Sequence, residues 1–270
     1  MEETTQTPLI FGHRGCRGIM PENTLEGFKQ ALTYNIDGIE WDVVVNKDKQ
    51  LVISHEEVMD KSYCLNPDGS EIKNEAKNNL YRMSQKEIQQ FDCGSKVYSK
   101  FPEQKKIKTY KPLVQEAFEK IDFKGKTILF EIKSEEKLYQ THQPKPKEYV
   151  SIILKEVENF KYKEQIVFMC FDAKILELLH QKAPEYRLVF LHEGIGKSAN
   201  KLLGKLTFKP YALGIYSKFI TEKIVAESHK KGVKVFAWTV NKEKEFKRLL
   251  GTKLDGIITD YPNVFEHGKW

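Results

Sequence analysis

Charged side chains recur two residues apart in two segments of the chain that have the composition of β-strands. Glu40 and Asp42 lie in one of these segments, and Glu131 and Lys133 end the other. Because successive side chains of a strand point to opposite faces, each segment turns both members of its pair to the same side. Adjacent carboxylates repel each other unless a cation holds them, and oxygen ligands without cysteine or clustered histidine suit a hard divalent cation such as Mg²⁺ or Ca²⁺. We therefore predict that Glu40, Asp42 and Glu131 bind one such cation.

Alternatively, Glu40 and Asp42 bind no metal and form ion pairs with Arg14 or Lys133. Networks of ion pairs also gather carboxylates, so a pair of acidic residues is not by itself a metal site. The third carboxylate, Glu131, favours the metal interpretation because it comes from a different strand.

Two histidines, one arginine and one lysine of the chain suit chemistry on a phosphate. Imidazole titrates near neutral pH, so His13 and His55 are candidates for the general acid and the general base, in either order. Arg14 offers paired N–H donors to a phosphate, and Lys133 offers a point charge. Trp238 is a candidate wall for an apolar or glycerol-like part of a substrate, with a place in the core as the alternative.

The segment Pro-Glu-Asn-Thr at residues 21–24 precedes a helical pattern. Asn23 and Glu26 have the spacing of a capping box, so we predict that Asn23 caps this helix and that Glu26 bonds back to it. For Glu22 and Asn23, a role in positioning the metal ligands or the substrate is the alternative.

Eight runs of β-branched and aromatic residues alternate with helical patterns along almost the whole chain. The runs cover residues 9–13, 38–45, 127–133, 165–170, 187–191, 212–216, 233–239 and 256–259. Such alternation indicates βα units that build a parallel sheet, and eight units in about 250 residues predict a (β/α)8 TIM barrel of the α/β class. Functional groups of that fold lie at the carboxyl ends of the strands, which is where His13, Lys133 and Trp238 fall.

One long segment interrupts this alternation. Polar turns break an already weak periodicity between the second and third barrel strands, and we predict an insertion at about residues 56–111. A short β-rich run just before it, residues 51–54, is expected to pair back onto the second strand and to bring His55 to the metal ligands. We expect residues 1–270 as a whole to form one barrel domain.

The composition limits the classes of function. The chain has 44 lysines and arginines against 38 acidic residues, and this mild excess suits a small anionic molecule and falls short of the charge expected of a nucleic-acid-binding protein. No stretch approaches the roughly 18 apolar residues that span a bilayer, so we expect a soluble protein without stable membrane insertion. We expect it in the cytoplasm, and a periplasmic or secreted location stays open because a removed signal peptide leaves no trace. The oligomeric state is left open.

The four cysteines are widely spaced and form neither a CxxC pair nor the pattern of a small disulfide-rich domain. We expect all of them to be reduced thiols or buried fillers of the core: Cys16, Cys64, Cys93 and Cys170.

The motifs of this chain, taken together, resemble those of the glycerophosphodiester phosphodiesterase family. They are His-Arg-Gly at 13–15, Pro-Glu-Asn-Thr at 21–24, Glu-x-Asp at 40–42, His55, Asp-Cys-Gly at 92–94, Glu-Ile-Lys at 131–133, Phe-Asp at 171–172, Trp-Thr-Val-Asn at 238–241 and Asp-Gly-Ile-Ile-Thr-Asp-Tyr-Pro at 255–262. Each short motif is weak, whereas their combination over nearly the full length is specific.

The resemblance implies a TIM barrel with an insertion after its second strand, and an activity that depends on Ca²⁺ or Mg²⁺. Its members hydrolyse small glycerophosphodiesters, such as glycerophosphocholine or glycerophosphoethanolamine, to an alcohol and sn-glycerol 3-phosphate. The mechanism that the resemblance implies is an attack of the substrate's own glycerol hydroxyl on phosphorus, which gives a cyclic phosphate that water opens. By resemblance, the metal ligands are Glu40, Asp42 and Glu131. The acid–base pair is His13 and His55, and the phosphate-binding residues are Arg14 and Lys133.

One position departs from the family pattern. The family commonly has aspartate after the second histidine, whereas this chain has Glu56, which is one methylene longer. We expect activity to survive this change, and we do not place Glu56 in contact with the metal or the substrate.

Other functions fit the same physical pattern. A phosphatidylinositol-specific phospholipase C or a sphingomyelinase D-like lyase also uses a TIM barrel, and such a lyase would leave a cyclic phosphate as product. A barrel that binds a phosphorylated ligand without turnover is the non-enzymatic alternative. It requires the loss of a catalytic group, and both histidines and all three carboxylates are present.

Overall fold

The computed structural model describes residues 7–265, so the ends of the expected 1–270 domain lie outside the described residues. Within that range, eight parallel strands close into a barrel, because the first strand pairs with both the second and the last. They are β1 (Leu9–Gly12), β2 (Gly38–Val45), β4 (Thr127–Ile132), β5 (Ile166–Cys170), β6 (Arg187–His192), β7 (Ala212–Tyr216), β8 (Lys234–Trp238) and β9 (Gly256–Thr259). Each agrees with its predicted run to within one residue at either end, and the (β/α)8 barrel is confirmed.

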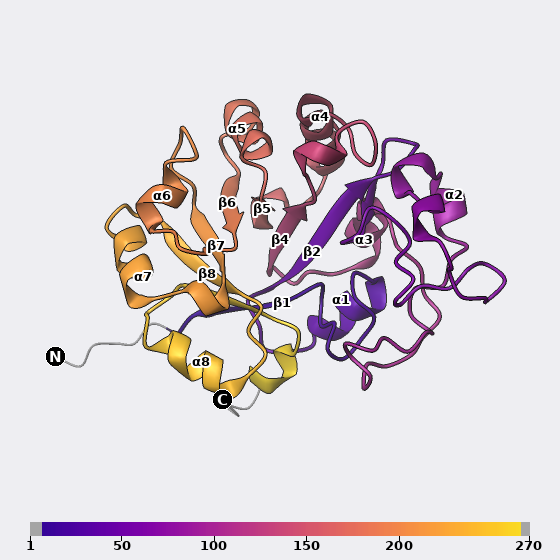
Figure 1. The fold of residues 1–270 in the computed structure, drawn as a ribbon, viewed down its shortest axis with the longest axis horizontal. Coiled ribbons are helices and arrows are strands. Elements are labelled where there is room, and N and C mark those ends of the chain that lie inside the picture. The colour runs from indigo at the N-terminus through magenta and orange to yellow at the C-terminus, as the bar shows by residue number, and fades with distance from the viewer. Residues whose placement is uncertain (1–6, 266–270) are drawn as a thin grey trace.

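Helices surround the strands and cover the outside of the barrel (Figure 1). They are α1 (Leu25–Ala31), α3 (Val114–Lys120), α4 (Pro146–Val157), α5 (Ala173–Lys182), α6 (Ala199–Leu203), α7 (Glu222–His229) and α8 (Glu243–Leu250). Each turns an apolar stripe to the strands; in α5, for example, Ile175, Leu176 and Leu179 are buried. Short 3₁₀ helices near the strand ends are η3 (Glu136–Leu138), η4 (Lys163–Gln165), η5 (Ser217–Phe219) and η6 (Pro262–Phe265).

The alternation of side chains along β2 places charge inside the barrel and aromatic packing outside it. Trp41 is fully buried and lies with its ring 5.3 to 5.9 Å from the rings of four phenylalanines, Phe28, Phe118, Phe123 and Phe130. Its neighbours Glu40 and Asp42 point the other way, to the barrel interior, as period two requires. The apolar packing of Trp41 therefore fixes the direction of both carboxylates.

Apolar side chains fill the barrel interior and form a separate hydrophobic cluster there. The cluster includes Phe11, Leu129, Val167, Val189 and Phe236. Each of these is at most 1% exposed. The filled interior excludes water from one side of the charged groups, which strengthens every electrostatic interaction among them.

Strand β3 (Leu51–Ile53) pairs antiparallel with β2, which confirms the predicted hairpin. After it, residues 54–113 contain only short helices, namely η1 (Glu75–Lys77), η2 (Leu80–Arg82) and α2 (Gln85–Ile88). This segment lies beside the barrel, next to α1 and α3 (Figure 1).

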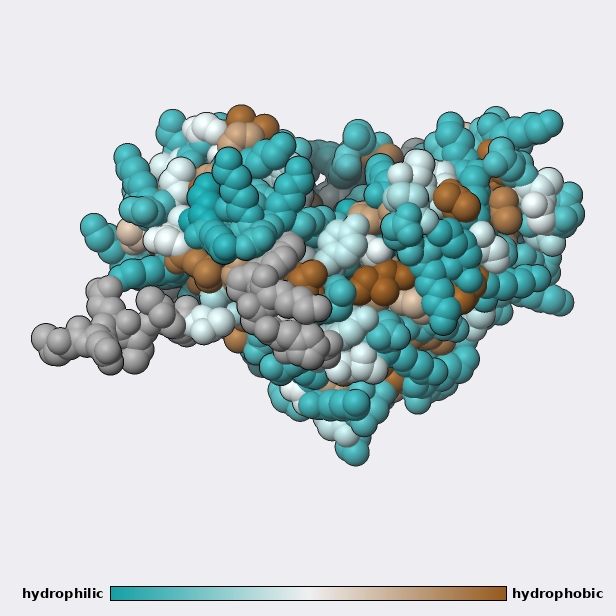
Figure 2. All heavy atoms as spheres, turned by 90° about the horizontal axis from the view of Figure 1, so that it is seen from below, coloured by the Kyte–Doolittle hydropathy of each residue, from teal (hydrophilic) through white to brown (hydrophobic). Residues whose placement is uncertain are grey.

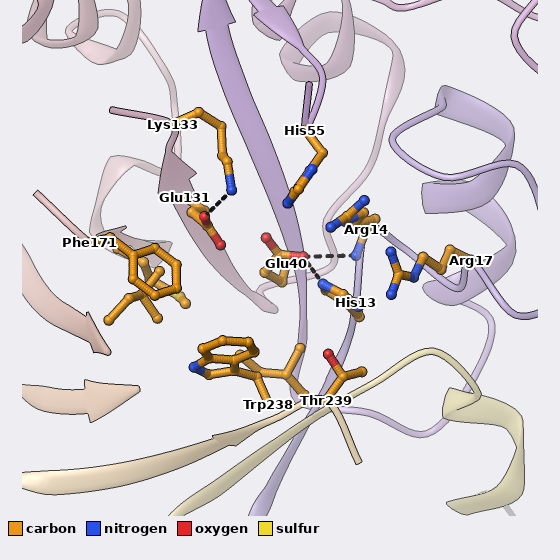
Figure 3. Close-up of a pocket in the computed structure, with 13 residues that line it drawn as sticks. His13, Arg14, Arg17, Glu40, His55, Glu131, Lys133, Phe171, Trp238 and Thr239 are labelled. Carbon is orange, nitrogen blue, oxygen red and sulfur yellow. Dashed lines mark hydrogen bonds and ion pairs between the residues drawn. The ribbon is translucent and has the colours of Figure 1, made fainter. Parts of the chain in front are cut away.

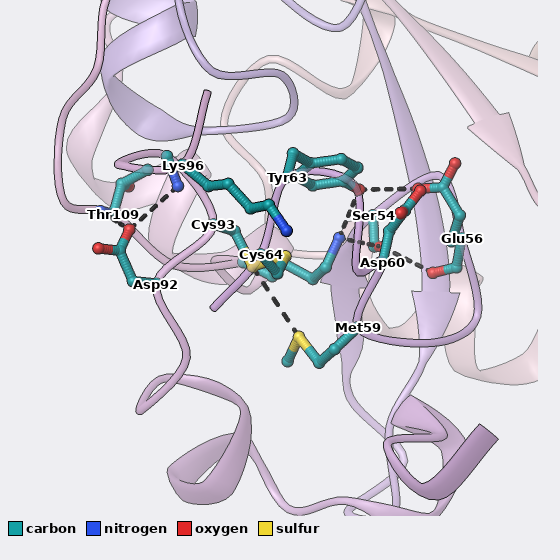
Figure 4. The surroundings of a disulfide bond; sticks show 12 residues. Ser54, Glu56, Met59, Asp60, Tyr63, Cys64, Asp92, Cys93, Lys96 and Thr109 are labelled. Carbon is teal, nitrogen blue, oxygen red and sulfur yellow. Dashed lines mark hydrogen bonds between the residues drawn. A yellow bond between two sulfur atoms is a disulfide. The ribbon is translucent and has the colours of Figure 1, made fainter. Parts of the chain in front are cut away.

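A disulfide joins Cys64 to Cys93 inside this segment (Figure 4). The expectation of reduced thiols is therefore wrong for these two, whereas the other two cysteines are buried and free. The pairing follows from the backbone. Leu65 and Asp92 exchange two backbone hydrogen bonds, of 2.7 and 3.2 Å, and this antiparallel pairing sets Cys64 opposite Cys93.

The surface is mostly hydrophilic. In Figure 2, hydrophilic side chains cover most of the face shown, and apolar ones form small separate patches. Among the described residues the large exposed apolar side chains are Val97, Phe171, Ile195 and Leu250, of which Phe171 borders the cavity described below. No helix within residues 7–265 is long and apolar enough to cross a membrane.

Loss of the disulfide is expected to destabilise the protein. The Cys64→Ser/Cys93→Ser variant should lower the free energy of unfolding by about 2–4 kcal/mol, because a link across 29 residues restricts the unfolded chain. Urea denaturation of wild type and variant measures the difference. A reductant should shift the wild type toward the variant and leave the variant unchanged; equal stability of the two oxidised proteins would contradict the prediction.

Candidate functional site

A cavity of about 240 Å³ opens at the carboxyl ends of the barrel strands (Figure 3). Its lining contains seven of the eight candidate residues, namely His13, Arg14, Glu40, His55, Glu131, Lys133 and Trp238. The eighth, Asp42, lies behind this lining and is completely buried. Residues that the sequence reasoning did not select complete the lining, and they are Arg17, Met169, Phe171, Leu191, Thr239 and Ile258.

Three carboxylates form a buried cluster beside this cavity. Strands β2 and β4 pair with Asp42 opposite Glu131, which sets Glu131 beside the other two, and the ligand oxygens of the three residues lie within 4.8 Å of one another. Burial, together with the charges of Asp42 and Glu131, raises the pKa of Glu40 well above its usual range. Glu40 Oε1 and Asp42 Oδ1 have no hydrogen-bond partner within the described residues. Unpartnered carboxylate oxygens so close together are a donor set that fits a hard divalent cation.

Two cations partly balance the cluster. Arg14 Nε lies 3.2 Å from Asp42 Oδ2, and Arg14 Nη1 donates to Glu22 Oε1 at 2.5 Å. Lys133 Nζ donates to Glu131 Oε1 at 2.6 Å and lies 3.7 Å from Asp42 Oδ1. Burial acts to raise the pKa of Asp42, but Arg14 and the other positive groups nearby hold it well below its usual range. The ion pairs of the alternative interpretation are thus present, yet neither cation forms an ion pair with Glu40, the carboxylate whose pKa burial and its acidic neighbours raise.

His13 follows β1, with Nδ1 2.6 Å from Asp260 Oδ1 and Nε2 3.8 Å from Glu40 Oε2. Asp260 follows β9, which pairs with β1, so closure of the barrel brings the two residues together. Arg17 Nε and Asn241 Nδ2 donate to the Asp260 carboxylate at 2.8 and 2.5 Å. Burial and Arg17 lower the pKa of His13 to about 4, against the opposite effect of Asp260. Because the carboxylate engages Nδ1, Nε2 is the ring nitrogen left for the cavity.

His55 follows β3 and is held by the irregular segment after it. Its Nδ1 lies 2.8 Å from Oε1 of Glu56, the residue at which the chain departs from the family pattern. The Tyr63 hydroxyl donates to Glu56 Oε2 at 2.7 Å, and Lys111 Nζ donates to Tyr63 at 2.9 Å and to Ser54 Oγ at 2.8 Å. Figure 4 shows Tyr63 meeting Glu56 close to the disulfide. Glu56 therefore contacts the second imidazole as Asp260 contacts the first.

The capping box predicted for Asn23 and Glu26 is wrong. Thr24 is the N-cap of α1, with Oγ1 accepting a backbone N–H at 3.0 Å, and Glu26 is exposed. Asn23 has a positive φ of 55° and donates its side-chain amide to Asp42 Oδ2 at 2.9 Å. Glu22 accepts from Arg14, as described above. Asn23 and Glu22 therefore contact Asp42 and Arg14 of the charged cluster, and a role in positioning the metal ligands or the substrate stays a prediction.

Aromatic side chains form another part of the wall. Trp238 ends β8, and its ring centroid lies 5.6 Å from that of Phe171 and 5.4 Å from that of Tyr216. Phe171 is 41% exposed, so it lies at the mouth of the cavity. Lys133 Nζ lies 5.9 Å from the centre of the Phe171 ring. Trp238 thus lines the cavity, and its role as a wall for the substrate stays a prediction.

Arg17 and Asp260 are charged residues of the site that the sequence reasoning did not select. Asp260 immediately follows the last predicted strand, so its place at a carboxyl end was a usable signal. Arg17 gave no such signal, because its contact with Asp260 depends on the path of the loop after β1.

Comparisons with known proteins show the family of the chain. The model of the glycerophosphoryl diester phosphodiesterase family matches residues 13–264. A glycerophosphodiester phosphodiesterase from Caldanaerobacter subterraneus subsp. tengcongensis is 30% identical over 257 residues, which cover 95% of this chain and 95% of that protein. A glycerophosphodiester phosphodiesterase from Bacillus altitudinis is 28% identical over 255 residues, which cover 94% of this chain and 95% of that protein.

Solved structures share the fold. A protein from Silicibacter pomeroyi, described as a glycerophosphoryl diester phosphodiesterase, has a TM-score of 0.86 and 29% identity, over 95% of this chain and 91% of that chain. A phosphodiesterase from Oleispira antarctica, solved in complex with the product sn-glycerol-3-phosphate, has a TM-score of 0.76 and 24% identity, over 94% of each chain. Since the family model covers nearly the whole sequence, the chain belongs to the glycerophosphoryl diester phosphodiesterase family, a family of phosphoric diester hydrolases.

Proposed function

We propose that this cavity is an active site that hydrolyses glycerophosphodiesters, such as glycerophosphocholine or glycerophosphoethanolamine, to an alcohol and sn-glycerol 3-phosphate. One observation carries the proposal. Two imidazoles, each in contact with a carboxylate, line one cavity of about 240 Å³, and a cluster of three buried carboxylates lies beside it. The imidazoles suit proton transfer, the carboxylates suit a divalent cation, and membership of the family supplies the class of substrate.

Glu40, Asp42 and Glu131 are the proposed ligands of one Mg²⁺ or Ca²⁺. Their fit rests on the short distances between their oxygens and on the unpartnered Glu40 Oε1 and Asp42 Oδ1. When bound, the cation would lower the pKa of an attacking hydroxyl and balance charge at phosphorus. The raised pKa of Glu40 in the protein alone means that a proton and a cation compete for this carboxylate.

Arg14 and Lys133 are the proposed phosphate-binding residues, Arg14 through paired N–H donors and Lys133 through its ammonium group. His13 and His55 are the proposed acid–base pair. One imidazole accepts the proton of the attacking hydroxyl, and the other donates a proton to the leaving oxygen. The proposed nucleophile is the glycerol hydroxyl of the substrate itself, which gives a cyclic phosphate that water opens. Trp238 would form a wall beside the organic part of the substrate.

Asp260 and Glu56 are the proposed positioning residues of the two imidazoles. Each engages Nδ1 of its histidine and leaves Nε2 free to exchange a proton with the substrate. We further propose that residues 56–111 form an insertion of the barrel domain, and that this insertion holds Glu56 in place through Tyr63 and Lys111.

Release of sn-glycerol 3-phosphate from glycerophosphocholine tests the proposed function. We expect release with Mg²⁺ or Ca²⁺, none with EDTA, and recovery when either metal is restored. His13→Ala and His55→Ala should each lower kcat by roughly 100-fold or more, because general acid–base catalysis contributes at least about that much.

His180→Ala, which changes an exposed histidine of α5, is the matched control and should retain activity. A cyclic phosphate as the final product would indicate a lyase instead. Activity that survives EDTA and both histidine variants would contradict the proposed site.

Removal of the Tyr63 hydroxyl is expected to weaken catalysis rather than binding. In Tyr63→Phe, kcat should fall about tenfold while KM stays nearly constant, because Glu56 loses a partner that holds it against His55. Steady-state kinetics and thermal unfolding measure both effects, with Tyr81→Phe in the same segment as the control. A loss of thermal stability with unchanged kcat would mean that Tyr63 only supports the fold.

The stability of the protein in acid should depend on Asp260. Burial acts to raise its pKa, but His13 and Arg17 hold it well below its ordinary value of 3.8. Such a carboxylate stabilises the fold fully above its unfolded pKa, and this stabilisation is lost as the pH falls toward the folded value. The free energy of unfolding of the wild type should therefore fall more steeply below about pH 4 than that of Asp260→Asn.

Urea denaturation between pH 3 and pH 7 measures these slopes. Glu158→Gln, which changes an exposed carboxylate, should keep the wild-type slope. Identical slopes for Asp260→Asn and wild type would show that Asp260 has no depressed pKa in the folded protein.

A further inference from the structure

A second cavity, of about 650 Å³, adjoins the first at the ends of β7 and β8. Thr239 lines both cavities. Trp238, in the wall of the first, has its ring centroid 5.4 Å from that of Tyr216, in the wall of the second. A molecule held in the first cavity can therefore extend across Trp238 and Thr239 into the second.

Three lysines line this second cavity, which we call the lysine groove: Lys218, Lys242 and Lys244. All three are exposed, and within residues 7–265 none of them forms an ion pair with a carboxylate. The Lys218 ammonium lies 5.7 Å from the centre of the Tyr216 ring, which is a cation–π contact. The positive charge of these side chains is therefore available to a ligand.

The remaining charges of the lysine groove do not cancel the lysines. Arg248 also lines it and donates to the backbone carbonyls of Ser217 and Ile220 at 2.7 and 2.9 Å. Glu245, the acidic residue of the lining, accepts the Ser217 hydroxyl at 2.6 Å. The lining of the lysine groove thus carries four cationic side chains and one carboxylate. The nearby Glu243 pairs with Lys247 on the same helix.

The first cavity is too small to hold a large diester completely. Its volume of about 240 Å³ lies below the range of roughly 300–1,000 Å³ that small-molecule sites occupy. If the phosphate binds at His13, His55 and Arg14, the glycerol and the phosphate occupy part of this space, and a bulky alcohol would extend beyond it. The lysine groove shares a wall with the cavity and has the volume to receive that alcohol.

We propose that the lysine groove is the head-group subsite of this enzyme, and that it favours a glycerophosphodiester whose alcohol carries a further negative charge, such as a phosphate. The inference rests on the proposed function, because it requires the phosphodiester to bind in the first cavity. Unpaired ammonium groups raise the local concentration of an anionic group and repel a cationic one such as choline.

Three substrates test this proposal, namely glycerophosphoinositol 4-phosphate, glycerophosphoinositol and glycerophosphocholine. The first two differ only in one phosphate on the head group, so the ratio of their kcat/KM values isolates the effect of charge. At low salt, wild-type enzyme should prefer the phosphorylated substrate by roughly tenfold, the combined effect of several exposed ion pairs. The preference should shrink toward unity at about 0.5 M salt, because ions screen exposed charges.

The Lys218→Ala/Lys242→Ala/Lys244→Ala variant should lower this ratio to within about twofold of unity. The matched control changes three exposed lysines near the amino ends of β5 and β8, on the opposite rim of the barrel. They are Lys163, Lys230 and Lys231, and their alanine variant should keep the wild-type ratio.

The two ways in which the idea can fail are distinguishable. Release of sn-glycerol 3-phosphate from none of the three substrates would overturn the proposed function and the subsite with it. Release from all of them, with equal kcat/KM for the two inositol substrates or with a preference that the groove variant retains, would overturn the head-group subsite alone.

Discussion

The ion pair between Arg14 and Asp42 is the interaction on which the rest of the site depends. Asp42 is completely buried beside two other carboxylates, and a charge in that position is stable only with a partner. The Arg14 side chain supplies that partner at 3.2 Å, while its backbone N–H donates to Glu40 Oε2 at 2.8 Å. Because His13 precedes Arg14 in the chain, the same residue that stabilises the carboxylates also sets the position of an imidazole.

The two imidazoles depend on different parts of the molecule. Asp260 is 247 residues from His13 and reaches it across the pairing of the first and last strands, so this contact exists only when the barrel is closed. Glu56 is next to His55 in the sequence, and Tyr63 holds it from within the irregular segment. The barrel and that segment therefore each complete one half of the proposed acid–base pair.

The parts of the structure that could be predicted are those with a regular period. Period two along β2 gave the direction of Glu40 and Asp42, and the alternation of strands and helices gave the barrel. The link between Cys64 and Cys93 could not be predicted, because it depends on the path of a segment with weak periodicity. The capping box predicted at Asn23 was wrong for another reason. Capping-box spacing is a local signal, whereas the Asn23 amide donates to Asp42, a strand residue 19 positions away. Contacts that depend on the path of a loop thus account for most of what the sequence did not reveal.

Arg14 and Asn23 also share an unusual backbone, with φ of 49° and 55°. A left-handed conformation costs most residues with a side chain about 1 kcal/mol, and asparagine less, so this cost offsets part of the stabilisation that Arg14 and Asn23 give the buried Asp42 carboxylate. Replacing either with glycine would relieve the backbone and remove a partner of the buried carboxylate. Glycine is therefore not the stabilising substitution at these two positions that their backbone alone would suggest. Removing one partner of a buried ion pair costs roughly 3–5 kcal/mol, which exceeds the backbone strain that the substitution relieves.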